Sequence, residues 1–217
     1  MTSPDLHALA ERFDRRCVHL TERGRTVSLA THRLLARGEP VSDEAIAAAT
    51  GLAGAEVRRV MDGWPSVQRD VRGRITGFWG LSLDETAHRF VVEGRTLHTW
   101  CAWDALFLPR ILGRGADVSS RSGASGVEVR LRVTPSDVVS LTGPDVVVSF
   151  VDPDRCDFAA DRVISTFCCH VFFFATREEG EAWVRERDDG TFLLTLEEAF
   201  DLGHRTNALM YGDALMD

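Results

Sequence analysis

The chain contains no lysine, and all 25 of its basic residues are arginine. Without a lysine amine it cannot form a Schiff base with a carbonyl substrate or use a P-loop lysine to hold a nucleotide phosphate. It also has no run of about eighteen apolar residues that could span a membrane, and its first residues lack the apolar core of a signal peptide. We therefore expect a cytoplasmic protein with no membrane partner.

The five cysteines are odd in number, which argues against a framework of disulfides, and no pair of them has the C-x₂-C spacing of a structural zinc site. A chain without an export signal normally keeps its thiols reduced. We expect free cysteines, and any metal would have to be held by residues from distant segments. The five cysteines are Cys17, Cys101, Cys156, Cys168 and Cys169.

Charge is unevenly distributed along the 217 residues, whose net charge is −8. Residues 1–80 carry a net charge of +2 and the remainder −10. The overall negative charge argues against a general nucleic-acid binder. The difference between the two parts predicts two modules, residues 1–80 and residues 81–217.

The first module has the pattern of a winged helix. Apolar residues follow the start signal Ser3-Pro4-Asp5 at helical spacing, as far as Cys17 and Leu20, and this places Cys17 in the core. Further helices are expected at about 27–36, 43–50 and 55–62, followed by a hairpin at 67–70 and 74–78. Its arginines could contact DNA, but the small basic excess favours a structural module, so no nucleic-acid partner is expected.

The second module mixes strands with short helices, without regular βαβ alternation. This predicts an α+β fold with a mainly antiparallel sheet and flanking helices. Helices are expected at 99–111, from Thr134, and after the capping boxes Thr176/Glu179 and Thr195/Glu198. The strands are expected at 88–92, 95–97, 127–133, 146–151, 167–174 and 192–195.

A thiol stands three residues before a carboxylate in LHTWCAWDALF (Leu97–Phe107). If a helix begins near Thr99, Cys101 lies in its first turn, where free amides and the helix dipole favour a thiolate. Asp104 then shares a helix face with Cys101. Such a carboxylate could hold and pass on a proton, although a solvated Asp104 beside an incidental cysteine explains the pattern equally well.

The apolar run FCCHVFFF (Phe167–Phe174) contains two further thiols. In an extended strand, Cys168 and His170 would point to one side and Cys169 to the other. Taken alone, the cysteines are best explained as small apolar residues of a buried strand. Two thiols from distant segments with one carboxylate would, however, suit a soft, thiophilic metal. No histidine has a context that favours a protease-like base.

The combination of WCAWD with FCCHVFFFAT resembles the bacterial organomercurial lyases, also called alkylmercury lyases. The resemblance covers most of the chain and includes GFWGLSL (Gly77–Leu83) and LEEAFDLGHRTNA near the end. The family often has another cysteine just after its VSS segment. Ser122 stands at that place here.

The resemblance implies a winged-helix-like N-terminal region, an α+β core, and protonolysis of the carbon–mercury bond in mercury detoxification. Cys101 and Cys168 would be the two mercury-binding thiols. Asp104 would assist proton transfer and is also a candidate metal ligand, and Cys169 is a secondary candidate ligand. It further implies no organic cofactor, Hg(II) as a bound product, external thiols for turnover, and mercuric reductase as acceptor of the Hg(II).

Two other functions remain open from the residues alone. One is a protein that binds or senses soft metals through the same thiols without turnover, and the other is a winged-helix transcription regulator. Trp79, Trp100 and Trp103 could line a substrate pocket, but core filling is favoured for each.

Overall fold

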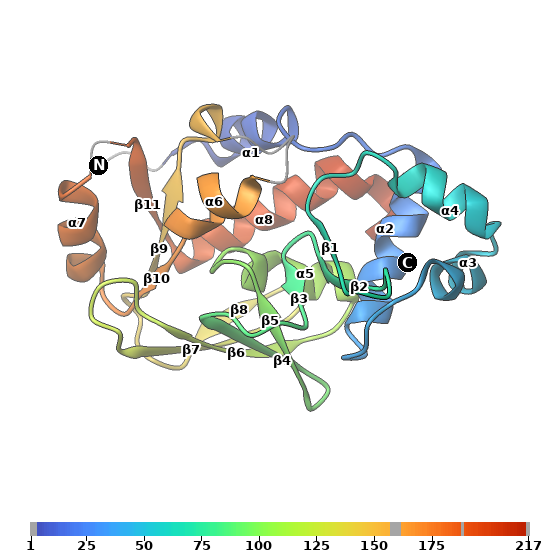
Figure 1. Ribbon diagram of the computed structural model, residues 1–217. Helices are drawn as coiled ribbons and strands as arrows, with labels where there is room; N and C mark the ends of the chain where they lie inside the picture. Colours follow the sequence, from blue (N-terminus) through green and yellow to red (C-terminus); the bar gives the residue numbers. More distant parts are fainter. Residues whose placement is uncertain (1–3, 157–161, 188, 216–217) are drawn as a thin grey trace.

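An N-terminal group of helices precedes a strand-rich remainder in the computed structural model, which describes residues 4–156, 162–187 and 189–215 (Figure 1). The order of helices followed by a hairpin confirms the predicted organisation of the N-terminal region. Its elements are α1 (Leu6–Asp14), α2 (Glu22–Leu35), α3 (Asp43–Thr50), α4 (Gly54–Met61), β1 (Val67–Arg69) and β2 (Ile75–Phe78).

Capping side chains explain where the N-terminal helices begin and end. Asp5 caps α1, since its carboxylate accepts from the amides at positions 7 and 8, whereas Ser3 lies outside the described residues. Helix α1 ends at Asp14, so the prediction that Cys17 lies on this helix is wrong. Ser42 caps α3 as predicted, and Gly51 ends it in the left-handed conformation.

A larger antiparallel sheet has the strand order β1-β2-β3-β5-β4-β6-β7-β8. Because β2 pairs with β3, hydrogen bonding continues from the N-terminal hairpin into the core. The division at residue 80 therefore stays a prediction. The added strands are β3 (Leu81–Ser82), β4 (His88–Val92), β5 (Arg95–Thr99), β6 (Ala116–Arg121), β7 (Glu128–Val133) and β8 (Val138–Ser140).

Strand β7 shows the predicted alternation, with every second side chain buried. The residues after it do not form the predicted helix. The amide of Thr134 instead donates to the carbonyl of Asp137 over 2.8 Å, and this closes a turn into β8. Pairing of β8 with β7 outweighs the local helix-start signal.

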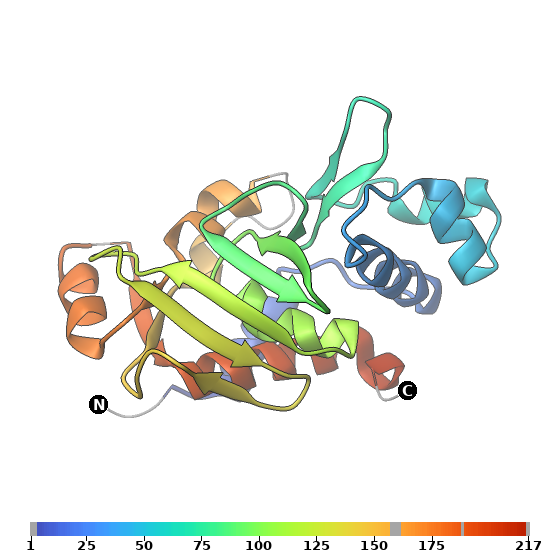
Figure 2. The same cartoon turned by 90° about the horizontal axis from the view of Figure 1, so that it is seen from below.

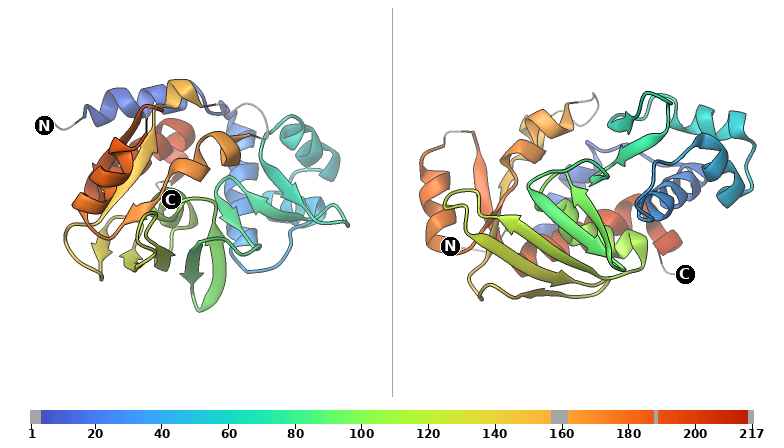
Figure 3. Two further views of the ribbon diagram at one scale, coloured as in Figure 1. Left: turned by 60° about the vertical axis from the view of Figure 1, so that its left-hand side comes forward. Right: turned by 60° about the horizontal axis from the view of Figure 1, so that its bottom comes forward.

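A smaller sheet has the buried strand β9 (Val147–Val151) at its centre, between β10 (Phe173–Phe174) and β11 (Thr191–Thr195). Figure 2 shows the larger sheet in front of α5 (Asp104–Leu112) and α8 (Leu196–Tyr211). Helix α7 (Arg177–Arg185) lies at the opposite end from α3 and α4 (Figure 3). The remaining helical segments are α6 (Val163–Thr166), η1 (Pro153–Arg155), η2 (Cys168–His170) and η3 (Gly212–Leu215).

Helix α8 connects the two parts of the molecule, since it packs on α1 as well as on α5. Its start is the predicted capping box, with Thr195 and Glu198 bonded reciprocally. At Thr176 only half of the predicted box is present, because the carboxylate of Glu179 accepts instead from the amide of Ala175 and the hydroxyl of Ser122. No helix among the described residues is long and apolar enough to cross a membrane.

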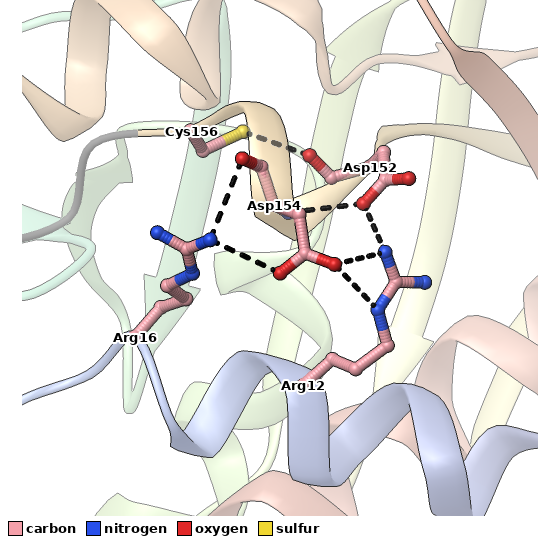
Figure 4. Close-up of polar contacts among 5 residues, drawn as sticks. All are labelled: Arg12, Arg16, Asp152, Asp154 and Cys156. Carbon is pink, nitrogen blue, oxygen red and sulfur yellow. Dashed lines mark hydrogen bonds and ion pairs between the residues drawn. The ribbon is translucent and has the colours of Figure 1, made fainter.

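Two arginines attach α1 to the turn that follows β9 (Figure 4). Arg12 pairs with Asp152 and Asp154, and Arg16 pairs with Asp154 at 3.2 Å. The hydrogen bond with Arg12 lowers the pKa of the Asp154 carboxyl. The thiol of Cys156 donates to the carbonyl of Asp152 over 3.5 Å. The arginine contacts attach α1 to the end of β9.

Candidate active site

Two thiols and one carboxylate from distant segments meet inside the protein. The ligand atoms of Cys101, Asp104 and Cys168 all lie within 4.8 Å of one another. The three residues are 0%, 7% and 5% exposed. Within residues 4–156, 162–187 and 189–215, no other three His, Cys, Asp or Glu side chains bring their ligand atoms this close. The structure thus brings together the three residues singled out in the sequence.

Cys101 lies in a tight connection between β5 and α5, rather than in the first turn of a helix. Thr99 is the last residue of β5 and pairs with Leu81 and His88, so the prediction that it caps a helix is wrong. The Thr99 hydroxyl donates to the carbonyl of Cys101 over 2.9 Å. The amide of Cys101 donates to Oδ2 of Asp104 over 2.8 Å. These bonds set the carboxylate beside the thiol.

Cys168 and Cys169 lie in the short 3₁₀ segment η2, not in the predicted extended strand. Successive residues of such a helix project in different directions. Cys168 is therefore buried in the site, whereas Cys169 is exposed and its thiol donates to the carbonyl of Ser165 over 3.1 Å. Cys169, the secondary candidate ligand, is not part of the three-residue group.

Burial controls the proton affinities of the three groups. It raises the pKa of the Cys101 thiol well above its usual value. A hydrogen bond from Cys101 favours the Cys168 thiolate, but burial and the nearby Asp104 charge outweigh it and raise the pKa of Cys168. Burial also raises the pKa of Asp104 to about 6. At neutral pH the site holds two neutral thiols and a largely ionised carboxylate.

This charge state reverses the prediction that Cys101 is activated by its position alone. The amides of a helix N-terminus would have favoured the thiolate, but α5 begins only at Asp104. Removal from water is the larger effect, because it penalises every charged form in the site. A base is therefore needed to take the thiol protons, and Asp104 is the adjacent carboxylate.

A cavity of about 130 Å³ adjoins the site, with Cys168 and Asp104 in its wall. Trp79, Trp100 and Trp103 also line it, and all three pack in or against the hydrophobic core as well, so both roles considered for them in the sequence are present. Several further lining residues were missed in the sequence, where nothing distinguishes them from ordinary core positions. They include Cys17, Val18, His32, Phe107, Asn207 and Tyr211.

Gly80 lies directly against the carboxylate of Asp104. Its φ is +97°, and a Cβ atom added there would stand 2.7 Å from both Cγ and Oδ1 of Asp104. Only glycine combines this backbone conformation with so close an approach. Gly80 is therefore a positioning residue for the acid.

Gly80→Ala is expected to lower the rate of a reaction that uses the Asp104 carboxylate by at least about tenfold, because an ångström-scale displacement of a reacting group can cost about a hundredfold. Gly113→Ala is the matched control. Gly113 also has a positive φ, but a Cβ there would meet nothing within 4 Å. Equal activity of the two variants in a gas-chromatographic assay would contradict a positioning role for Gly80.

Ser122, at the place of the family's additional cysteine, has a structural partner. Its hydroxyl donates to Oε2 of Glu179 over 2.8 Å, and the same oxygen accepts from the amide of Ala175 over 3.1 Å. These bonds attach the end of β6 to the start of α7. Ser122 is not among the residues that line the cavity.

A buried pair of thiols and a carboxylate beside an apolar cavity, on an antiparallel α+β core, is a set of groups suited to a soft metal. Residues 81–207 match the family model of alkylmercury lyase, and residues 9–79 match the helix-turn-helix domain of alkylmercury lyase. The chain belongs to the alkylmercury lyase family, whose members cleave the carbon–mercury bond. The resemblance seen in the sequence is confirmed.

Several relatives extend over most of the chain. The alkylmercury lyase of Streptomyces lividans is 43% identical over 83% of this chain and 82% of its own. The alkylmercury lyase of Staphylococcus epidermidis is 40% identical over 81% of this chain and 79% of its own length. A crystal structure of the mercury-bound form of MerB2 has a TM-score of 0.74 and 21% identity, covering 95% of this chain and 98% of that one. This last likeness confirms the α+β fold.

Proposed function

We propose that Cys101 and Cys168 bind the mercury of alkyl- and arylmercury compounds while Asp104 moves the proton that releases the hydrocarbon. The observation that carries this proposal is the convergence of two thiols and one carboxylate within 4.8 Å in a buried site. Sulfur is the ligand that soft metals prefer. A carboxylate within reach of both sulfurs can serve as base and then as acid.

The reaction begins with exchange of thiol partners. A substrate R–Hg–SR′ gives up its carrier thiol as R′SH, with the proton of the first protein thiol, and mercury then joins that sulfur. The second thiol passes its proton to Asp104 as its own sulfur joins the metal. Electron donation by two sulfurs weakens the mercury–carbon bond, and Asp104 delivers the proton to carbon. One C–H bond forms, the Hg–C bond breaks, and Hg(II) remains on two thiolates.

The raised pKa of Asp104, about 6, suits a group that must both accept and donate a proton near neutral pH. A carboxyl with its ordinary pKa of 3.8 would be a weaker base toward the thiols. Neutral thiols also carry no charge into the apolar cavity before mercury arrives. Burial of the site therefore serves the reaction.

The residues supply all the groups that the reaction needs, so the proposed enzyme uses no organic cofactor. A dithiolate holds Hg(II) tightly, and small external thiols are therefore proposed to remove it and to carry it to mercuric reductase. The proposed location of this exchange is the cytoplasm, where thiols are kept reduced. Residues 1–80 and 81–217 are proposed as the two modules, with the first packed on the core rather than bound to DNA.

Incubation with phenylmercury and excess thiol tests the proposal. The purified chain is expected to release one benzene for each phenylmercury consumed, measured by gas chromatography with the mercury followed by mass spectrometry. Protein that binds phenylmercury but releases no benzene above the background with thiol alone would be a soft-metal binding protein, and the proposal would be rejected.

A further inference from the structure

One wall of the active-site cavity comes from the N-terminal helix-turn-helix region, to which the mechanism assigns no role. Six lining residues precede Gly80, namely Cys17, Val18, His32, Pro65, Ser66 and Trp79. We propose that Trp79 in this wall sets the size of the organic group that the enzyme accepts. The inference rests on the proposed function, because it concerns the organic part of the same substrate.

Trp79 is held rigidly by its surroundings. The indole Nε1 donates to the carbonyl of Pro65 over 2.9 Å. The ring stacks on Phe78, with centroids 4.6 Å apart and planes 19° apart, and packs on Trp64 with centroids 4.8 Å apart. A fixed ring makes a pocket wall that does not yield when a larger group enters.

The backbone of Trp79 adopts a conformation that bulky residues rarely take, with φ at +37°. Such strain persists only where the surrounding contacts impose it, and it is concentrated at functional sites. An ordinary core tryptophan would not need this conformation. Here it accompanies the Trp79-Gly80 turn, in which Trp79 lines the cavity and Gly80 touches Asp104.

The position of Asp104 identifies which part of the substrate meets Trp79. In the proposed reaction Asp104 protonates the carbon bound to mercury, so the organic group must lie beside this carboxylate. Trp79 directly precedes Gly80, and a Cβ atom added to Gly80 would stand 2.7 Å from Cγ of Asp104. Trp79 and Asp104 line the same cavity, so we assign the wall formed by Trp79 to the organic group.

The volume of the cavity sets the scale of the restriction. About 130 Å³ is available, and an apolar cavity of about 150 Å³ holds one benzene molecule. The cavity is thus close in volume to a single aromatic ring, whereas a fused two-ring group needs more space than this. Removal of the indole would supply that space.

The experiment compares methylmercury, phenylmercury and 1-naphthylmercury as substrates of the full-length enzyme and its variants. In Trp79→Leu the ratio of kcat/KM for naphthylmercury to that for methylmercury is expected to rise at least about tenfold, the usual effect of a change in pocket size. Trp64→Leu is the matched control, since Trp64 packs on the same ring but does not line the cavity. Its ratio should stay much closer to that of the wild type, because the hydrogen bond to Pro65 and the stacking on Phe78 still hold the Trp79 ring.

A wild-type ratio in folded Trp79→Leu would overturn the inference, and so would an equal rise in Trp64→Leu, which would assign the effect to general loosening. If Trp79→Leu does not fold, Trp79→Phe is tested in its place. The ratio of kcat/KM for naphthylmercury to that for methylmercury should then rise by a smaller factor, and an unchanged ratio would contradict the proposal. If the wild type released no hydrocarbon from any of the three substrates, the proposed function itself would fail, and this result is distinct from an unchanged ratio.

Discussion

Replacement of either Cys101 or Cys168 by serine is expected to lower kcat for hydrocarbon release by at least about a thousandfold. A serine oxygen is a poor ligand for a soft metal, so only one sulfur would remain to weaken the mercury–carbon bond. Because the two sulfurs act as a unit, the double variant should be hardly slower than either single variant. Single-turnover release of benzene from phenylmercury measures all three rates.

The exposed neighbour Cys169 provides the control for this prediction. Cys169→Ser removes a thiol from the same segment without touching the buried group, and it should retain the wild-type rate. Mass spectrometry should show one intact phenylmercury on the remaining active-site thiol of each single variant. Near-normal benzene release by Cys101→Ser or Cys168→Ser would exclude the two-sulfur mechanism.

Asp104→Asn is expected to abolish most of the activity and at the same time to stabilise the folded protein. The amide cannot accept a thiol proton, and loss of a general acid–base group typically costs about 10² to 10⁴ in rate. The stabilisation follows from burial of the charge. The pKa of Asp104 rises from an ordinary 3.8 to about 6, which corresponds to about 3 kcal/mol at pH 7.

Because the pKa of Asp104 is higher in the folded chain than in the unfolded chain, the stability difference between wild type and Asp104→Asn depends on pH. Below about pH 4 the carboxyl is protonated in both the folded and the unfolded chain, so wild type and variant should be equally stable. Between about pH 4 and 6 the folded chain keeps a proton that the unfolded chain releases, and wild-type stability therefore falls as pH rises. Above about pH 6 the full cost is present, and asparagine avoids it.

Urea unfolding of the mercury-free protein at several pH values measures this difference. Asp117→Asn is the control, because Asp117 lies exposed on β6, and its effect should stay small at every pH. An Asp104→Asn variant that is less stable than the wild type at pH 7, or a stability difference between the two proteins that is the same at pH 4 and pH 7, would show that other interactions of Asp104 outweigh the cost of burying its charge.

Local sequence signals predicted many elements correctly because each depends on residues a few positions apart. Ser42 and Gly51 bound α3 through contacts within one turn. The alternation in β7 also needs only its own residues. The errors occur where distant partners decide. Thr99 continues a strand because Leu81 and His88 pair with it, and no signal near Thr99 shows either partner.

The sequence by itself singled out Cys101, Asp104 and Cys168 as the candidate reactive groups, since they stand in segments specific enough to reveal their family. Only the tertiary structure decided their protonation, the exclusion of Cys169 and the cavity wall formed by Trp79. The reason is physical. Removal from water depends on every element that packs around a side chain, and those elements come from parts of the chain that lie far apart in sequence.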